Sequence, residues 1–95
     1  EREIFRRDKG FCVYCGKDLL QDMEVFLCQS IDHFLPVSKG GGKDADNLKL
    51  CCRNCQNYKG TKYAEDVVAT IALINDGRMQ WQKEFESLKD ELRGR

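Results

Sequence analysis

The stretch that decides the fold of this chain reads Ile31-Asp32-His33-Phe34-Leu35-Pro36-Val37-Ser38-Lys39-Gly40-Gly41-Gly42. It holds the only histidine and the only proline of the 95 residues, and the histidine directly follows a carboxylate. One Cys-x-x-Cys pair lies upstream and another lies downstream. An ion bound by both pairs would draw the two ends of this segment together. We therefore expect an active site that is bracketed by a metal site.

The two cysteine pairs predict a structural zinc ion held by Cys12, Cys15, Cys52 and Cys55. Each pair has the two-residue gap of a zinc knuckle, and four thiolates close a tetrahedral site so that no position is left for water. Cys51 is an alternative to Cys52, but Cys52 preserves the gap of the first knuckle. We expect Cys28, in an apolar segment, to be a buried small hydrophobe.

Size and composition predict a single domain over residues 1–95 with a small core that needs an additional constraint, which a zinc ion would supply. No apolar run approaches the length of a membrane span, and the first residues lack the apolar centre of a signal peptide. We therefore expect a cytoplasmic, reducing location and no membrane partner. The alternative for the six cysteines is a secreted domain with three disulfides, which two-residue gaps disfavour.

The formal net charge is zero, but basic residues cluster beside the Asp-His pair. From residue 39 to residue 62 there are six basic side chains and two acidic ones, whereas the chain after residue 62 is net acidic. Such a cluster is suited to a phosphate backbone, and a solvated face without a partner is the alternative. The predicted nucleic-acid contacts are Lys39, Lys43, Arg53, Lys59 and Lys62.

The pattern along the chain predicts an α+β fold. We expect a helix over residues 1–8, a strand over 24–32, a return strand over 48–50 and a short helix ending at Gly60. Beyond the core of about 6–62, an extension over 63–95 should form two helices: one is capped by Thr61 and runs to about Asn75, with a stop at Gly77, and the other follows. The apolar face of the last helix is expected to pack in the core, with a homodimer surface as the alternative; its residues are Trp81, Phe85, Leu88 and Leu92.

The Asp-His pair suggests metal-assisted chemistry. The carboxylate of Asp32 is a hard ligand for Mg²⁺ or Mn²⁺, and an amide carbonyl can add a second ligand. Histidine is the usual general base in proteins, so His33 can take a proton from an attacking water. Neighbouring side chains of a strand point to opposite sides, so Asp32 can face the metal while His33 faces the nucleophile.

Three further segments carry a resemblance to a known family. They are Cys12-Val13-Tyr14-Cys15-Gly16, then Asp46-Asn47-Leu48-Lys49-Leu50-Cys51-Cys52-Arg53-Asn54-Cys55, then Lys59-Gly60. In this order, with the central Asp-His segment between the first two, they closely resemble the zinc-containing HNH endonucleases. The resemblance runs from about Arg6 to Lys62.

The resemblance implies a ββα-metal (His-Me finger) fold that binds one divalent cation. It also implies an enzyme that hydrolyses phosphodiester bonds of DNA, most simply double-stranded DNA. By position, Asp32 is implied as a metal ligand, His33 as the general base, and Asn47 as the asparagine that fixes the loop and orients His33. The chain departs from the family at Gln56, where histidine or asparagine is usual. Gln56 is the expected second ligand, with Asn57 as the alternative.

The implied function is therefore that of a Mg- or Mn-dependent endonuclease. One catalytic site per chain implies nicking. The main alternative is a non-catalytic zinc-knuckle module that binds nucleic acid or protein. A third interpretation makes the C-terminal helices an assembly element that the zinc unit braces. Dependence on Mg²⁺ or Mn²⁺ separates the first from the second.

Overall fold

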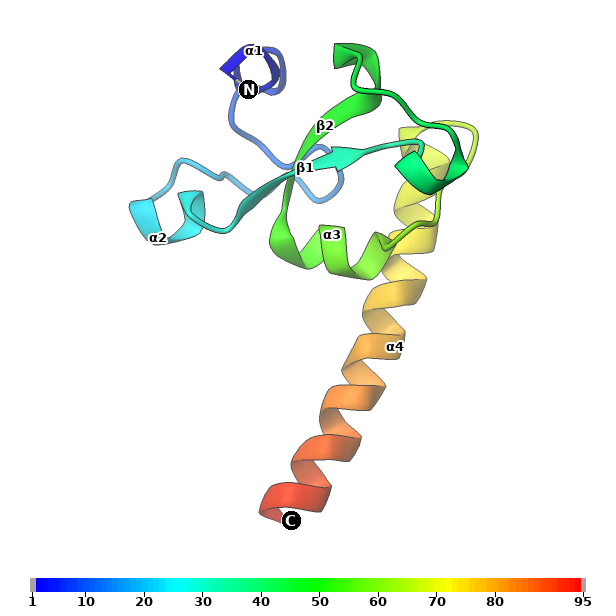
Figure 1. The fold of residues 1–95 in the computed structure, drawn as a ribbon. Helices are drawn as coiled ribbons and strands as arrows, with labels where there is room; N and C mark the ends of the chain where they lie inside the picture. Colours follow the sequence, from blue (N-terminus) through cyan, green and yellow to red (C-terminus); the bar gives the residue numbers. More distant parts are fainter. Residues whose placement is uncertain (1, 95) are drawn as a thin grey trace.

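A two-stranded antiparallel hairpin forms the centre of the fold in the computed structural model, which describes residues 2–94. Strand β1 (Gln29–His33) pairs with β2 (Leu48–Cys52), with Gln29 opposite Cys52 and His33 opposite Leu48 (Figure 1). The loop between the strands holds two short 3-10 helices, Val37–Lys39 and Ala45–Asn47. The register places the Asp-His pair at the end of β1, as the sequence predicts.

Helix α3 (Arg53–Lys59) follows β2 without a linker and packs against both strands. Its N-cap is Cys52, whose sulfur accepts a hydrogen bond from the amide of Cys55, and it ends at Gly60. Gly60 has a positive φ of 57°, a conformation that glycine adopts without steric cost. Hairpin and helix together form the expected ββα unit, so the predicted α+β class is confirmed.

Helix α1 (Arg2–Asp8) is fixed to the edge of β2 by its last two residues. The guanidinium of Arg7 donates to the carbonyls of Ala45, at 2.6 Å, and Leu48, while Asp8 accepts from the amide of Leu50 at 3.0 Å. Burial acts to raise the pKa of Asp8, but hydrogen bonds from Arg7 and the Leu50 amide outweigh it and lower the pKa below its usual value. The sequence predicted this helix but not its anchoring role.

The expected strand over residues 24–32 is wrong in its first half. Residues Met23–Phe26 form a helical turn, α2, because the side chain of Asp22 caps it by accepting from the amide of Val25 at 2.8 Å. Strand β1 therefore begins only at Gln29. Cys28 is exposed between the two elements, which corrects the expectation that it is buried.

The two expected C-terminal helices are one helix, α4 (Val67–Arg93), which begins at the N-cap Asp66 and not at Thr61. Gly77 does not stop it. A Cβ at this position would lie 2.2 Å from the carbonyl oxygen of Tyr58, so glycine is there to let α4 approach the backbone of α3. Sequence reasoning read this glycine as a C-cap because a close-packing glycine and a terminal glycine look alike without the partner helix.

The C-terminal half of α4 projects away from the rest of the protein (Figure 1). Ile74 is buried, but the apolar side chains of the next turns remain 49–67 % exposed, which corrects the expectation that they pack in the core; they are Trp81, Phe85, Leu88 and Leu92. The helix also carries many charges, and no helix within residues 2–94 is long and apolar enough to cross a membrane.

Candidate active site and zinc centre

The four cysteines of the two knuckles form one cluster. The Sγ atoms of Cys12, Cys15, Cys52 and Cys55 all lie within 4.8 Å of one another. The thiol groups of the six described cysteines are free, and Cys51 is not part of the cluster. Four sulfur ligands at this spacing fit a tetrahedral zinc ion, which confirms the predicted choice of Cys52 over Cys51 as the cysteine that joins the cluster.

Backbone amides support negative charge on this cluster. The amide of Cys15 donates to the sulfur of Cys12, and the amide of Cys55 donates to the sulfur of Cys52, each at 3.4 Å. Hydrogen bonds from the neighbouring thiols lower the pKa of Cys12, while the same shared protons raise the pKa of Cys55. A set of sulfurs that stabilises thiolate in this way suits a metal cation.

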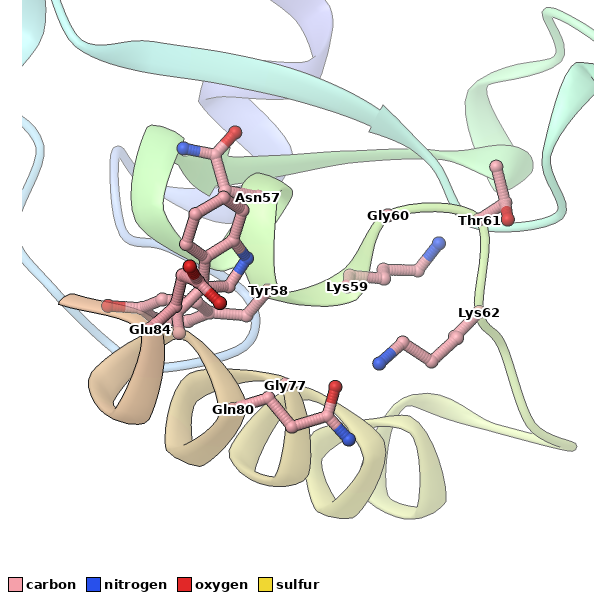
Figure 2. Close-up of a pocket in the computed structure, with 10 residues that line it drawn as sticks. Asn57, Tyr58, Lys59, Gly60, Thr61, Lys62, Gly77, Gln80 and Glu84 are labelled. Carbon is pink, nitrogen blue, oxygen red and sulfur yellow. The ribbon is translucent and has the colours of Figure 1, made fainter. Parts of the chain in front are cut away.

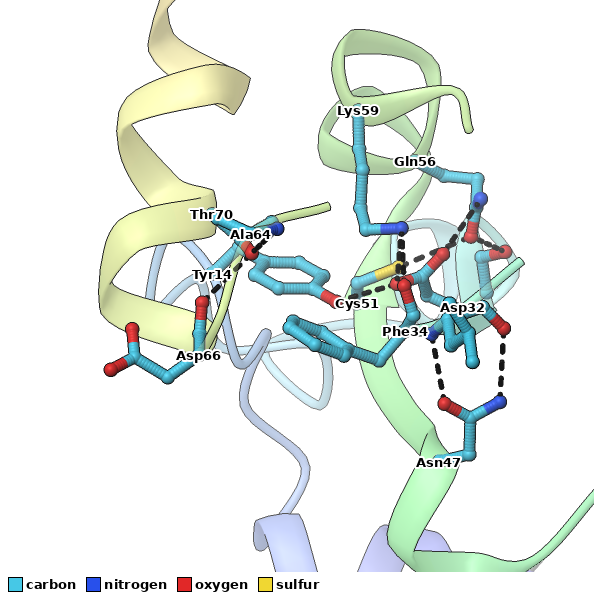
Figure 3. Close-up of polar contacts among 12 residues, drawn as sticks. Tyr14, Asp32, Phe34, Asn47, Cys51, Gln56, Lys59, Ala64, Asp66 and Thr70 are labelled. Carbon is cyan, nitrogen blue, oxygen red and sulfur yellow. Dashed lines mark hydrogen bonds and ion pairs between the residues drawn. The ribbon is translucent and has the colours of Figure 1, made fainter. Parts of the chain in front are cut away.

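Asp32 lies at the centre of a buried polar network on the side of the hairpin that faces α3 (Figure 3). Only 2 % of the residue is exposed. Its Oδ2 atom accepts from the Tyr14 hydroxyl at 2.5 Å and lies 3.3 Å from Nζ of Lys59. Its Oδ1 atom accepts from Nε2 of Gln56 at 3.2 Å. Both carboxylate oxygens therefore have partners within the protein.

Burial is the main cause that raises the pKa of Tyr14, and the hydrogen bond to Asp32 adds to it. Tyr14 therefore stays protonated and acts as a donor. Sequence reasoning missed this residue because a tyrosine between two zinc ligands carries no local signal of a contact with a carboxylate 18 residues away.

The structure distinguishes the two candidate amide ligands. Gln56 reaches Asp32, and its carbonyl Oε1 accepts from Ser30 at 3.2 Å. Asn57 lines a groove of about 500 Å³ between the end of α3 and α4, together with Tyr58 and Glu84 (Figure 2). Asn57 is exposed on that side of the helix, so the geometry favours Gln56 as the partner of Asp32.

The side chain of Asn47 holds the loop that follows His33. Its Oδ1 accepts from the amide of Leu35 at 2.8 Å, and its Nδ2 donates to the carbonyls of Leu35, at 3.1 Å, and Gly42, at 2.9 Å. The backbone carbonyl of Asn47 also accepts from the amide of Phe34. This is the bracing arrangement that the resemblance implies for the central asparagine.

Gly41 allows this bracing. A Cβ on Gly41 would lie 1.7 Å from the carbonyl oxygen of Leu35 and 3.0 Å from Nδ2 of Asn47. The loop can close against Asn47 only when this position lacks a side chain. Gly42 has no comparable restriction, because its nearest neighbour would be 3.9 Å away.

His33 is half-buried at the end of β1, opposite Leu48. None of the residues 2–94 makes a hydrogen bond to its imidazole. It adjoins Asp32 in the sequence but, as alternation along a strand requires, points to the other side of the strand. The imidazole nitrogens therefore have no hydrogen-bond partner among these residues and are available to an external group.

The five predicted nucleic-acid contacts do not share one environment. Lys39, Lys43 and Lys62 are exposed in loops, and Arg53 is exposed at the start of α3. Lys59 is completely buried and its ammonium is paired with Asp32, so it does not present a charge to a phosphate at the surface. The sequence gives no sign of this difference, because the burial of Lys59 depends on α3 packing against the hairpin.

The fold is therefore a ββα domain with an adjacent Asp-His pair and a four-cysteine cluster that could hold zinc. A protein-family model described as HNH endonuclease matches residues 12–70, which is more than half of the chain. This chain belongs to the HNH endonuclease family. No curated protein and no solved structure matches it.

Proposed function

We propose that this protein is a metal-dependent endonuclease that hydrolyses DNA phosphodiester bonds and nicks one strand at each encounter. The observation that carries the proposal is the arrangement around His33. Asp32 and Gln56 meet on one side of β1, His33 projects on the other, and Asn47 braces the loop that follows. Membership of a family of endonucleases supports the same conclusion.

The donor chemistry at Asp32 fits a hard divalent cation such as Mg²⁺ or Mn²⁺, with Asp32 and Gln56 as its protein ligands. A half-turn of the Gln56 amide would present Oε1 in place of Nε2 toward Asp32. The present neighbours of Oε1 tolerate that turn, since Ser30 Oγ and Cys51 Sγ can accept as well as donate. A cation bound there would neutralise the charge that grows on the phosphate oxygens during hydrolysis.

The residues of the chain supply the remaining steps. His33 takes the proton from the water that attacks phosphorus. Asn47 helps to position the end of β1 that carries His33, because its side chain hydrogen-bonds to both the amide and the carbonyl of Leu35. The products would carry 5′-phosphate and 3′-hydroxyl ends.

The exposed basic side chains of Lys39, Lys43, Arg53 and Lys62 support contact with double-stranded DNA. Lys39 and Lys43 lie in the loop that follows the Asp-His pair, whereas Arg53 lines a groove together with Asp22 and Glu24, where the surroundings are partly acidic. The free thiols suit a reducing compartment, where we expect the protein to act.

The exposed apolar face of α4 supports pairing of two copies, which would bring two active constellations together. A dimer of this kind would cut both strands of DNA, whereas a monomer would nick.

The second candidate is a zinc module that binds nucleic acid without cutting it. The observation that favours it is the engagement of Asp32, whose oxygens already contact Tyr14, Lys59 and Gln56. The two candidates differ in their need for a second metal, because the module needs zinc alone.

The deciding experiment incubates supercoiled plasmid with the zinc-loaded protein in EDTA, Mg²⁺ or Mn²⁺, with His33→Ala as the control. We expect open-circular product with Mg²⁺ or Mn²⁺ only, and its loss in His33→Ala while zinc content stays at one ion per chain. Wild-type rates of cleavage by His33→Ala would refute the proposed function.

A further inference from the structure

The ammonium of Lys59 is the buried positive charge next to the candidate active site. Lys59 lies in the last turn of α3, and no part of it is exposed. Its Nζ lies 3.3 Å from Oδ2 of Asp32 and donates to the carbonyl of Phe34 at 3.1 Å, and it lies 5.8 Å from the centre of the Phe34 ring. Figure 3 shows dashed lines from the ammonium to both of these residues.

The two residues that Lys59 contacts are the sequence neighbours of His33. Asp32 precedes the histidine and Phe34 follows it. A single group from α3 therefore contacts the side chain of the residue before His33 and the backbone carbonyl of the residue after it. The bond from the Phe34 amide to the Asn47 carbonyl adds a third constraint. These contacts constrain the two neighbours of His33, and no hydrogen bond among residues 2–94 joins Lys59 to the imidazole itself.

The same ammonium is the counter-ion of Asp32. Among residues 2–94, it is the only group that forms an ion pair with this carboxylate. A buried carboxylate without a counter-charge strongly destabilises a fold, and the ion pair with Lys59 supplies that counter-charge to Asp32. A divalent cation that binds Asp32 must then share the carboxylate with a positive charge already in place, and this repulsion weakens the binding.

We propose that Lys59 is a positioning residue with two opposite effects on the site. It increases the rate of cleavage by holding Asp32 and Phe34, and thereby His33, in place. It decreases the affinity of Asp32 for the divalent cation through its charge. The inference rests on the proposed function, since it takes Asp32 as a ligand of that cation.

The two effects predict that one variant gains affinity for Mn²⁺ and loses cleavage rate. In Lys59→Met, we expect Mn²⁺ to bind about tenfold more tightly or better, because the nearby positive charge is gone. At saturating Mn²⁺, the same variant should cleave plasmid about a hundredfold more slowly, because the Asp32 carboxylate and the Phe34 carbonyl on either side of His33 are no longer held. A purely structural role would lower metal affinity and cleavage together.

Mn²⁺ binding is measured on zinc-loaded protein from the loss of the electron paramagnetic resonance signal of free Mn²⁺, without DNA. Lys83→Met is the matched control, because it removes the same charge from an exposed position on α4. It should leave both Mn²⁺ affinity and cleavage within about twofold of wild type. Lys59→Gln is a second neutral variant whose amide can still donate to Phe34, so it should gain affinity but lose less activity than Lys59→Met.

The outcomes separate this inference from the function on which it rests. If Asp32→Asn leaves Mn²⁺ binding unchanged, Asp32 is not a ligand and the proposed metal site is wrong. If Asp32→Asn abolishes binding but neither Lys59 variant binds Mn²⁺ more tightly than wild type, the inference about Lys59 is overturned. Should Lys59→Met fail to fold, as circular dichroism would show, Lys59→Gln carries the same test.

Discussion

At the scale of single residues, the loop after His33 depends on contacts that one glycine makes possible. We predict that Gly41→Ala lowers both the cleavage rate and the melting temperature, because a Cβ there would lie 1.7 Å from the Leu35 carbonyl oxygen and the loop would have to open. Gly42→Ala is the control, since its Cβ meets nothing closer than 3.9 Å. Equal melting temperatures and rates for the two variants would contradict this account.

Asn47 provides a second prediction at this scale. Replacement by alanine removes three side-chain hydrogen bonds, to both polar backbone groups of Leu35 and to the Gly42 carbonyl. We expect a loss of about 1–3 kcal/mol in the free energy of unfolding and a fall in kcat with little change in the affinity for DNA. Urea unfolding and single-turnover cleavage measure the two effects, and zinc content should stay unchanged.

The lowered pKa of Asp8 predicts how the stability of the fold depends on pH. Its pKa is lowered in the folded state, so the unfolded state binds more protons near the usual value of 3.8. The stabilisation is fully present above that value and is lost as the pH falls through the lower folded pKa. Asp8→Asn should therefore unfold at a lower temperature than wild type at pH 7, and the gap should narrow below about pH 4.

Thermal unfolding of wild type and Asp8→Asn from pH 7 to pH 3, each with its zinc content measured, tests whether the gap in melting temperature narrows on acidification. A gap that widened on acidification would show that the carboxylate is not stabilised by Arg7 and the Leu50 amide. Arg2→Gln is a suitable control, because Arg2 is exposed on the same helix and its side chain makes no hydrogen bond or ion pair with another described residue.

At the scale of elements, the four-cysteine cluster joins the turn after α1 to the junction of β2 and α3. We predict that Cys52→Ser loses zinc and unfolds at a markedly lower temperature, whereas Cys51→Ser keeps one zinc ion per chain. Cys51 is buried beside Gln56 but lies outside the cluster, so the two adjacent cysteines form a matched pair. Retention of zinc by Cys52→Ser would show that the ligand set is wrong.

The zinc cluster and the hairpin could be predicted from sequence because their signals are local. A two-residue gap between cysteines fixes a knuckle, and Asp32-His33 before Pro36 marks the end of a strand. The role of Gly77 could not be predicted in this way. In the sequence it looks like a helix stop, and only the backbone of Tyr58 lying against α4 shows why a side chain is excluded.

The residues of the candidate site can likewise be separated into those with a local sequence signal and those without one. Asp32, His33 and Asn47 follow from the motif, but Tyr14 and Lys59 depend on contacts across the fold. A lysine near basic neighbours reads as a surface charge, and nothing in the local pattern separates Lys59 from the exposed Lys62. Periodicity likewise identifies the apolar face of α4 without showing what covers it.

Whole-molecule shape follows from α4, which extends beyond the ββα unit and helps to give the protein a longest dimension of 47 Å (Figure 1). We predict that the exposed face of its C-terminal half brings two copies together. Each copy would contribute four apolar side chains, a small contact by the standards of stable dimers, so association should appear only at roughly micromolar concentrations or above.

Light scattering over a dilution series tests this last prediction. The measured mass should rise from one chain toward two with concentration in wild type, and should stay at one chain in the double variant Phe85→Ser with Leu88→Ser. Val68→Ser is the control, because Val68 is 78 % exposed near the start of the same helix, away from that face.

If the wild type dimerises, raising its concentration should convert nicked plasmid to linear product, since two catalytic sites then act together. A wild-type mass of one chain at every concentration would refute the pairing.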